Sequence, residues 1–422
     1  MRKGREKMYE KITLPNGVRI VYEHMPHVRS AAVGIWVGAG SRYEKVSEGG
    51  SAHFVEHMLF KGTNKYSARE LADKMDAIGG QVNAYTTREN TCYYARVPDY
   101  HLDTAIELLG DMFFDSKFDQ ADVESERGVI LEEIDMYNDA PDDVVTERLM
   151  LGCFKGALGR PILGKASVLE KMDSQSLREF KESRYTSGRV VVALAGSFTE
   201  ETIKRIEARF SVMEKKTERK PQTCRYAPCV TVKRKATEQN HLCLGFPGLP
   251  AGSEKRFAVQ LMSGMLGEGM SSRLFQTVRE KYGLCYSIGS FSGGFAETGL
   301  FAVATAMGKE TELKAIGLIM DEIRRFREDG VTQDELDRAR EQVKANLVMS
   351  LESTTAHMNK LGFSTLCLDR CLSPEELIEG YDTVTTEDIL SLSRQVLDFE
   401  QMSFSAVGRV SAAEEYEKMF QK

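Results

Sequence analysis

The chain has 422 residues, of which 42% are hydrophobic and 28% are charged, and its formal net charge is −7. It is long enough for two or more domains with sizeable cores, and no apolar run reaches the length of a membrane span. No basic stripe interleaved with aromatic residues is present, so nothing in the sequence indicates a nucleic-acid partner.

The N-terminus and the cysteines both indicate a cytoplasmic protein. Residues 1–11 are charged and contain no apolar segment, so we expect neither a secretory signal nor a transit peptide. The eight cysteines are scattered and form no C-x-x-C pair. This predicts free thiols in a reducing compartment rather than a disulfide framework or a cysteine metal site.

Two similar series of elements follow each other along the chain. In the first half, periodicity predicts a strand at 31–38, helices at 48–61 and 68–78, strands within 81–97, a helix at 103–114 and a strand at 189–195. In the second half, it predicts a strand at 241–246, helices at 255–266 and 271–281, strands within 285–305, a helix at 311–329 and a strand at 401–407. The repeated order predicts an α+β fold of two similar domains, each a largely antiparallel sheet with helices packed on one face.

A highly charged segment separates the two series. Residues 214–223 include one proline and almost no apolar side chains, which is typical of a linker. We therefore expect an N-terminal domain at 1–215, a linker at 216–229 and a C-terminal domain at 230–422.

The expected helix at 48–61 contains the pattern H-x-x-E-H, formed by His53, Glu56 and His57. Histidines four residues apart project from one helical face, which suits two nitrogen ligands on one zinc ion, and Glu56 lies on the same face. This order of residues is the inverzincin signature; the alternative is a polar helix face with two histidines satisfied in other ways. The matching helix at 255–266 has no such motif, so we expect only the first half to hold metal.

A third ligand has to come from another element, because a catalytic zinc site takes three protein ligands and keeps one open position. The best downstream candidate is a partly apolar helix within 119–136, on which Glu126 and Glu133 lie two turns apart on one face. We expect Glu133 to be the ligand and Glu126 to orient a ligand or hold a proton. The alternative for any single glutamate here is a solvated helix face, which we prefer for Glu132.

Together these residues resemble the pitrilysin/insulinase-type inverzincin zinc metallopeptidases. The motifs that carry the resemblance are the H-x-x-E-H set and Glu133, which follows His57 after 76 positions in the context E-R-x-V-I-L-x-E-I. The closer match is the branch of about this length, which includes bacterial zinc peptidases and the catalytic subunit of the mitochondrial processing peptidase. The resemblance implies an endopeptidase with one zinc per chain that hydrolyses short or unfolded peptides inside a closed chamber.

The expected strands within 81–97 extend the resemblance. Residues 83–91 carry the family pattern N-A-x-T-x-x-E-x-T in full. This implies that Asn83 and Ala84 lie on an edge strand to which the peptide substrate adds as a further strand; the alternative is an ordinary strand. Glu89 is a candidate partner of a zinc histidine.

In the second half, Arg279 and Tyr286 match the family's Arg/Tyr pair, seven residues apart. A guanidinium suits the peptide backbone, and a phenol can donate to the scissile carbonyl oxygen as negative charge builds there. A surface arginine and a core-edge tyrosine are the alternatives for each residue alone. Because larger family members place the zinc and this pair in different lobes, the resemblance implies a homodimer in which the pair serves the partner's zinc site.

Two other functions fit the same fold. A specific peptidase for presequences or propeptides would favour basic segments, and the net charge of −7 is compatible with it. A non-catalytic structural subunit would need no metal chemistry, and the intact set of His53, Glu56, His57 and Glu133 argues against it.

Overall fold

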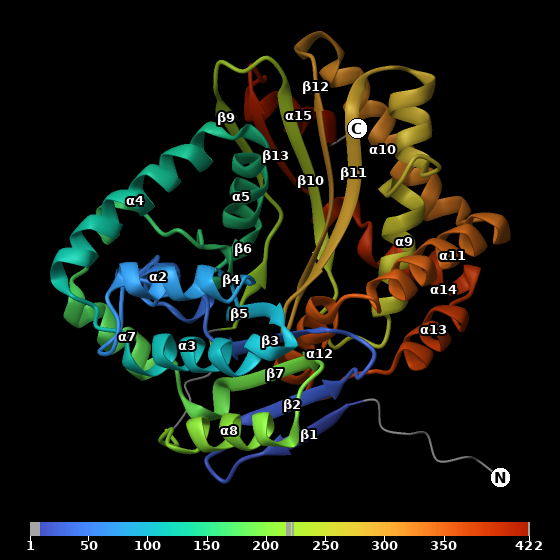
Figure 1. Cartoon of the computed structure of the whole chain (residues 1–422). Coiled ribbons are helices and arrows are strands. Elements are labelled where there is room, and N and C mark those ends of the chain that lie inside the picture. Colours follow the sequence, from blue (N-terminus) through green and yellow to red (C-terminus); the bar gives the residue numbers. More distant parts are fainter. Residues whose placement is uncertain (1–8, 217–220, 222, 421–422) are drawn as a thin grey trace, which may run out of the picture. The chain divides into compact units, whose positions relative to one another are not determined.

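The computed structural model describes residues 9–216, 221 and 223–420. The chain forms two compact units (Figure 1). Unit 1 consists of Met1–Ile134, Arg160–Gln222 and Val348–Ser373. Unit 2 consists of Asp135–Gly159, Thr223–Leu347 and Pro374–Lys422. Each unit contains one large sheet and its own apolar core.

The sheet of unit 1 has six strands in the order β1-β2-β7-β3-β5-β4. In that order the strands are Glu10–Thr13, Arg19–His24, Val190–Gly196, Ser30–Val37, Thr91–Pro98 and Gln81–Thr86. Neighbouring strands are antiparallel except for β2 and β7, which are parallel. The sheet ends at β4, which pairs with β5 on one side only.

Most helices of unit 1 share one core with one face of this sheet. They are α1 (Ser51–Met58), α2 (Ala68–Ala77), α3 (Leu102–Asp115), α4 (Gln120–Asp139), α6 (Ala166–Leu169), α7 (Ser174–Arg184) and α8 (Glu200–Ser211). Apolar residues at helical spacing supply the contact, as in α1, where Phe54, Val55 and Met58 are fully buried. Because these residues point into the core, the orientation of α1 is set, and its polar residues lie on the remaining face.

The opposite face of the same sheet is covered by α12 (Thr354–Leu368), which lies against β3 and β7. A Cβ atom at Gly362 would come within 2.1 Å of Nε1 of Trp36, so only glycine allows this close approach. His357 of α12 also binds Glu23 of β2, with 2.8 Å between Nδ1 and Oε2. The helix is held both by close packing and by a buried ion pair.

Unit 2 repeats this plan with a five-stranded sheet in the order β11-β12-β10-β13-β9. In that order the strands are Cys285–Gly294, Gly299–Met307, Asn240–Gly248, Ser403–Gly408 and Val230–Arg234. One face packs on α9 (Arg256–Gly267), the π-helix Phe275–Lys281, α10 (Glu312–Asp329), α11 (Gln333–Ser350), α13 (Pro374–Asp382), α14 (Thr386–Val396) and α15 (Ala413–Phe420). The other face packs on α5 (Pro141–Cys153), and β6 (Phe154–Lys155) pairs with β8 (Arg225–Tyr226).

Each unit includes one helix from the other half of the sequence, which the expected division of the chain at 216–229 did not predict. Helix α5 comes from the first half of the sequence and belongs to unit 2, whereas α12 comes from the second half and belongs to unit 1. The units are therefore not the contiguous stretches 1–215 and 230–422. The physical reason is that each sheet has a second apolar face that needs cover, and local periodicity does not say which sheet a helix covers. The expected linker at 216–229 lies partly outside the described residues.

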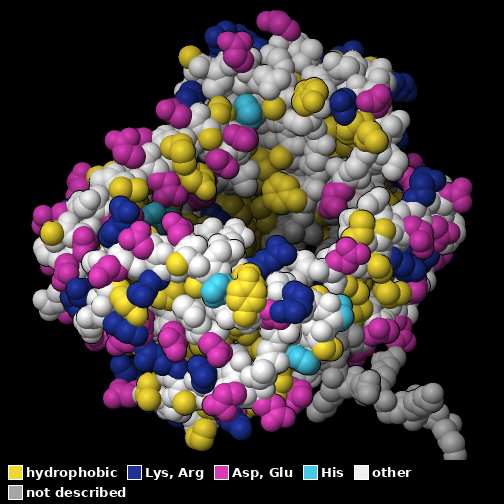
Figure 2. Space-filling model, viewed as in Figure 1, with side chains coloured by type: hydrophobic (Ala, Val, Ile, Leu, Met, Phe, Trp, Pro, Cys, Tyr) yellow, Lys and Arg dark blue, Asp and Glu magenta, His cyan; other side chains and the backbone are white. Residues whose placement is uncertain are grey.

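Three general features accompany this fold. None of the helices within the described residues is long and apolar enough to cross a membrane. None of the eight cysteines, all of which the structure describes, forms a disulfide. Figure 2 shows acidic and basic side chains intermingled over the visible surface of each unit rather than separated by sign.

Candidate metal centre

Helix α1 begins at a glycine turn that a buried carboxylate holds in place. Gly50 has φ of 99°, and a Cβ there would lie 2.7 Å from the carbonyl oxygen of Leu163. The Glu44 carboxylate accepts hydrogen bonds from the backbone nitrogens of Gly50 (3.0 Å) and Ala52 (2.8 Å). Burial raises the pKa of Glu44 to about 8, although these two donors act in the opposite direction. Glu44 thus acts as the N-terminal cap of α1, because it accepts hydrogen bonds from backbone N–H groups that have no partner within the helix.

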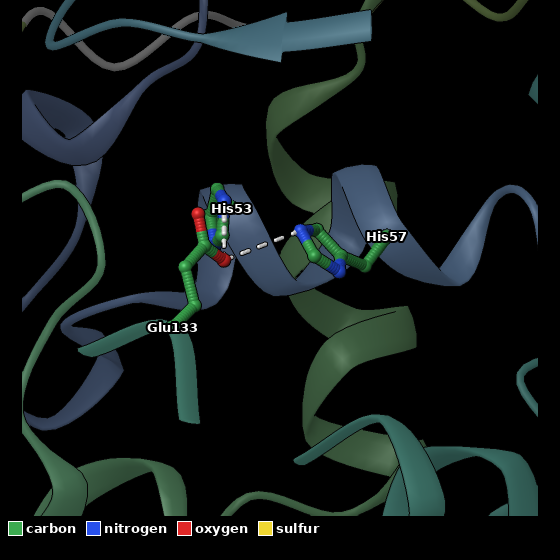
Figure 3. Close-up of side chains that lie close together, drawn as sticks. All are labelled: His53, His57 and Glu133. Atoms are coloured by element: carbon green, nitrogen blue, oxygen red, sulfur yellow. Dashed lines mark ion pairs between the residues drawn. The ribbon is translucent and has the colours of Figure 1, made fainter. Parts of the chain in front are cut away.

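His53, His57 and Glu133 converge on one point (Figure 3). The same carboxylate oxygen of Glu133 lies 3.6 Å from Nε2 of His53 and 3.8 Å from Nε2 of His57. Two ligand atoms bound to one tetrahedral zinc ion lie about 3.4 Å apart, so the donors are nearly at ligand spacing. Among the described residues, this is the one cluster of at least three potential donors close enough for a metal. The residues expected as ligands are therefore brought together, and their donor set fits zinc.

The two histidines differ in their surroundings. Burial, and secondarily the charge of His57, lower the pKa of His53 to about 3, so its imidazole is neutral at physiological pH. Burial also lowers the pKa of His57, but its hydrogen bond with Glu126 and the charges of nearby glutamates outweigh this and raise the pKa overall. A neutral imidazole is the form that binds a metal, which here would be through Nε2, the atom near Glu133. The other ring nitrogen of His53, Nδ1, has no hydrogen-bond partner among the described residues.

Glu126 lies behind His57, as expected. Its Oε1 is 2.8 Å from Nδ1 of His57, and its Oε2 forms an ion pair with Lys61. Burial raises the pKa of Glu126, but the hydrogen bonds with His57 and Lys61 outweigh it and lower the pKa overall. The ionised carboxylate fixes the orientation of the His57 ring and leaves Nε2 facing Glu133.

Glu56 lies on the same helix between the two histidines and is 9% exposed. Its Oε2 accepts a hydrogen bond of 2.5 Å from Oγ1 of Thr86, the last residue of β4. Burial raises its pKa above the ordinary value, with Thr86 and His57 acting against this and Glu133 acting with it. A carboxylate with a raised pKa beside a metal site is suited to accept and release a proton.

Asn83 and Ala84 lie on β4, at the edge of the sheet of unit 1. The backbone nitrogen of Ala84 donates to the side-chain Oδ1 of Asn83 at 2.8 Å. An edge strand offers backbone groups to an added strand, although the N–H of Ala84 would have to exchange its bond to Asn83 for one to that strand. Whether a substrate pairs there stays a prediction.

In unit 2, two irregularities place Arg279 and Tyr286 side by side. Arg279 lies in a π-helical turn, and Tyr286 lies at a register shift between Cys285 and Ser287 in β11. The Arg279 guanidinium is 5.2 Å from the centre of the Tyr286 ring and 4.4 Å from that of Phe275. Tyr286 is 79% exposed. Both π-helical turns and bulges occur often at functional sites, which favours a functional pair over a chance one.

Two family models match the chain. One, described as insulinase (peptidase family M16), matches residues 19–166, and one described as the peptidase M16 inactive domain matches residues 171–343. The uncharacterized zinc protease YmxG of Bacillus subtilis is 41% identical over 394 residues, covering 92% of this chain and 96% of its own length. An uncharacterized zinc protease of Streptomyces coelicolor is 40% identical over 409 residues, covering 94% of this chain and 89% of its own length. The chain belongs to peptidase family M16.

Two solved structures share the fold. The peptidase M16 inactive domain of Pseudomonas fluorescens superposes with a TM-score of 0.88 at 19% identity, covering 96% of this chain and 99% of the other. A protease from Helicobacter pylori gives a TM-score of 0.86 at 19% identity, covering 95% and 99%. The α+β fold with two similar, largely antiparallel domains is therefore confirmed.

Some contacts in this M16 peptidase could not be read from its sequence. Thr86, Lys61 and Glu44 all support the site, yet only Thr86 carried a signal, as the threonine of the N-A-x-T pattern. Glu89 forms an ion pair with buried Arg42, and its expected role beside a zinc histidine stays a prediction. A threonine hydroxyl and a lysine ammonium take their roles from tertiary neighbours, which sequence spacing does not define.

Proposed function

We propose that this M16 peptidase is a zinc-dependent endopeptidase that hydrolyses short or unfolded peptides. The observation that carries the proposal is the convergence of His53, His57 and Glu133, with the buried carboxylate of Glu56 on the same helix. The naming of relatives as zinc proteases supports zinc as the metal. We propose one ion per chain, because the described residues contain one cluster of this kind. The intact set argues against a purely structural subunit.

The protein side of the mechanism follows from the contacts. When zinc is held by His53, His57 and Glu133, it supplies Lewis acidity toward water and toward a peptide carbonyl. Glu56 takes the proton of the attacking water and passes it to the leaving amine nitrogen. Thr86 already donates to Oε2 of Glu56, so we assign the proton transfer to Oε1, the oxygen without this hydrogen bond.

Substrate binding is assigned to the edge of the sheet of unit 1. An extended peptide adds to β4 at Asn83 and Ala84 through backbone hydrogen bonds, which select for extended conformation more than for side-chain identity. This favours peptides and unfolded segments over folded proteins. A closed chamber, as the family resemblance implies, would strengthen that preference.

Substitution of Glu56 tests the proposal. In Glu56→Gln we expect peptide cleavage to fall at least about 100-fold, because the general base is lost, while bound zinc stays near that of the parent chain. The matched control is Glu132→Gln. Glu132 is exposed and directly precedes Glu133 on α4, so this variant should keep full activity. Parental activity in Glu56→Gln would contradict the mechanism.

We further propose that Arg279 and Tyr286 complete the zinc site of a partner subunit in a homodimer. A mixture of an Arg279→Ala/Tyr286→Phe chain with a Glu56→Gln chain tests this, since each carries one intact half of a site. Recovered cleavage in mixed dimers is the expected result. No recovery, with subunit exchange demonstrated by differently tagged chains, would overturn it.

A panel of neutral unfolded peptides and basic presequence-like peptides separates a general endopeptidase from a specific processing peptidase.

A further inference from the structure

The hydrogen bond between Thr86 and Glu56 has a defined direction. Thr86 lies opposite Thr91 in the antiparallel pairing of β4 with β5, and the two hydroxyl oxygens are 3.3 Å apart. The single proton of Thr91 is donated to the carbonyl oxygen of Ala39 at 2.9 Å. Thr86 donates its own proton to the Glu56 carboxylate, because that contact, at 2.5 Å, is much the shorter of its two and lies within the range of a charge-assisted O–H···O⁻ bond.

The surroundings make this contact a fixed one. Val82 and Ala84 of β4 pack with the core that also contains α1, so the face of the strand that carries Thr86 is the one turned toward that helix. Threonine is β-branched, which restricts rotation about its χ1 angle. Glu56 is 9% exposed, so loss of the hydroxyl would leave a buried carboxylate oxygen without this donor.

We propose that Thr86 is a positioning residue, whose hydroxyl holds the Glu56 carboxylate in a fixed place relative to β4. This inference rests on the proposed function, in which Glu56 is the general base and β4 binds the substrate. A single strand then sets both the register of the peptide and the position of the base. Rotation of the Glu56 side chain away from the scissile bond is what the hydroxyl prevents.

Two substitutions separate positioning from folding. Thr86→Val keeps the shape and removes the hydroxyl, so we expect kcat to fall about 10- to 100-fold with KM within twofold, as a misplaced catalytic group does. Thr86→Ser keeps the hydroxyl and should stay within about threefold of the parent kcat. The matched control is Thr202→Val, a buried threonine of α8 whose hydroxyl donates to Oδ1 of Asp103 at 3.3 Å; it should lower the thermal midpoint while leaving kcat unchanged.

A measurement on the metal-free chain tests the contact without any assay of activity. Thr86→Val should lower the thermal midpoint when Glu56 is present, because a buried carboxylate loses its donor, and should not lower it in a Glu56→Ala background. Parental kcat in Thr86→Val, or an equal loss of stability in both backgrounds, would overturn the inference. If the parent chain cleaves no peptide, the proposed function fails, while the stability comparison still decides whether Thr86 acts through Glu56.

Discussion

Helices α1 and α9 occupy matching places in the two units, yet only one of them is built for chemistry. Each contacts the edge strand of its own sheet, β4 for α1 and β11 for α9. Helix α1 buries His53 and Glu56 beside its apolar residues, whereas the buried side chains of α9 are apolar apart from Ser263. The duplicated plan therefore supplies packing, and a few polar side chains supply the site.

The difference has an energetic side. A buried polar group costs roughly 1–3 kcal/mol when it lacks a partner, so a site of this kind needs support from its neighbours. Unit 1 provides it through Thr86 on Glu56 and through Lys61 and Glu126 on His57. Helix α9 of unit 2 buries no charged side chain that would need such partners, so its buried face can be almost wholly apolar.

Loss of the third ligand should give the largest effect. In Glu133→Gln, two histidines alone remain on α1, and we expect zinc affinity to fall on the order of 1,000-fold. The matched substitution in unit 2 is Glu341→Gln, an exposed glutamate of α11, which should leave affinity unchanged. Competition with a chromophoric chelator measures both. Equal affinities in the two variants would break the comparison between the units.

Loss of a residue that supports a ligand without contacting the metal should have an intermediate effect on zinc affinity. Lys61→Met removes the cation that binds Glu126, so the His57 ring is held less firmly. We expect zinc affinity to fall about tenfold, at the low end of the range for groups behind a metal ligand. Lys65→Met, a neighbouring and more exposed lysine, is the control. An unchanged affinity in Lys61→Met would show that α1 needs no support beyond Glu126.

The smallest of the expected effects concerns pH. The local stability of α12 and that of α5 should change with pH in opposite directions. The hydrogen bond with Glu23 raises the pKa of His357 on α12, so its stabilisation is complete below about pH 6.5 and is lost as pH rises through the higher folded pKa. Burial lowers the pKa of His241, beside α5 in unit 2, so stability there is lost as pH falls below about 6.5.

Hydrogen exchange, corrected for intrinsic rates, separates these two responses. Protection of α12 should decline on going from pH 6 to pH 8.5, and His357→Gln should abolish that decline. Protection of α5 should decline toward pH 5, and His241→Gln should abolish it. A decline of the same sign in both helices would show that the two ionisations do not act locally.

Local pattern predicted the elements of the two repeated series and the residues of the candidate metal centre, but not the contacts between distant segments. The spacing of His53 and His57 and the helical position of Glu133 were enough to predict three potential metal ligands, which the structure brings together. The exchange of α5 and α12 was not predictable, because an amphipathic helix does not specify which of two similar sheets it covers. The π-helical turn at Arg279 and the bulge at Tyr286 also lack a local pattern, since both arise from how the chain packs.

We propose that α1 and α4 together hold one zinc ion per chain. Anomalous X-ray diffraction at the zinc absorption edge, on crystals of the zinc-loaded protein, tests it most directly. The account predicts one strong peak per chain, within bonding distance of Nε2 of His53, Nε2 of His57 and the carboxylate of Glu133. A strongest peak without these three ligands, or one in unit 2, would contradict it.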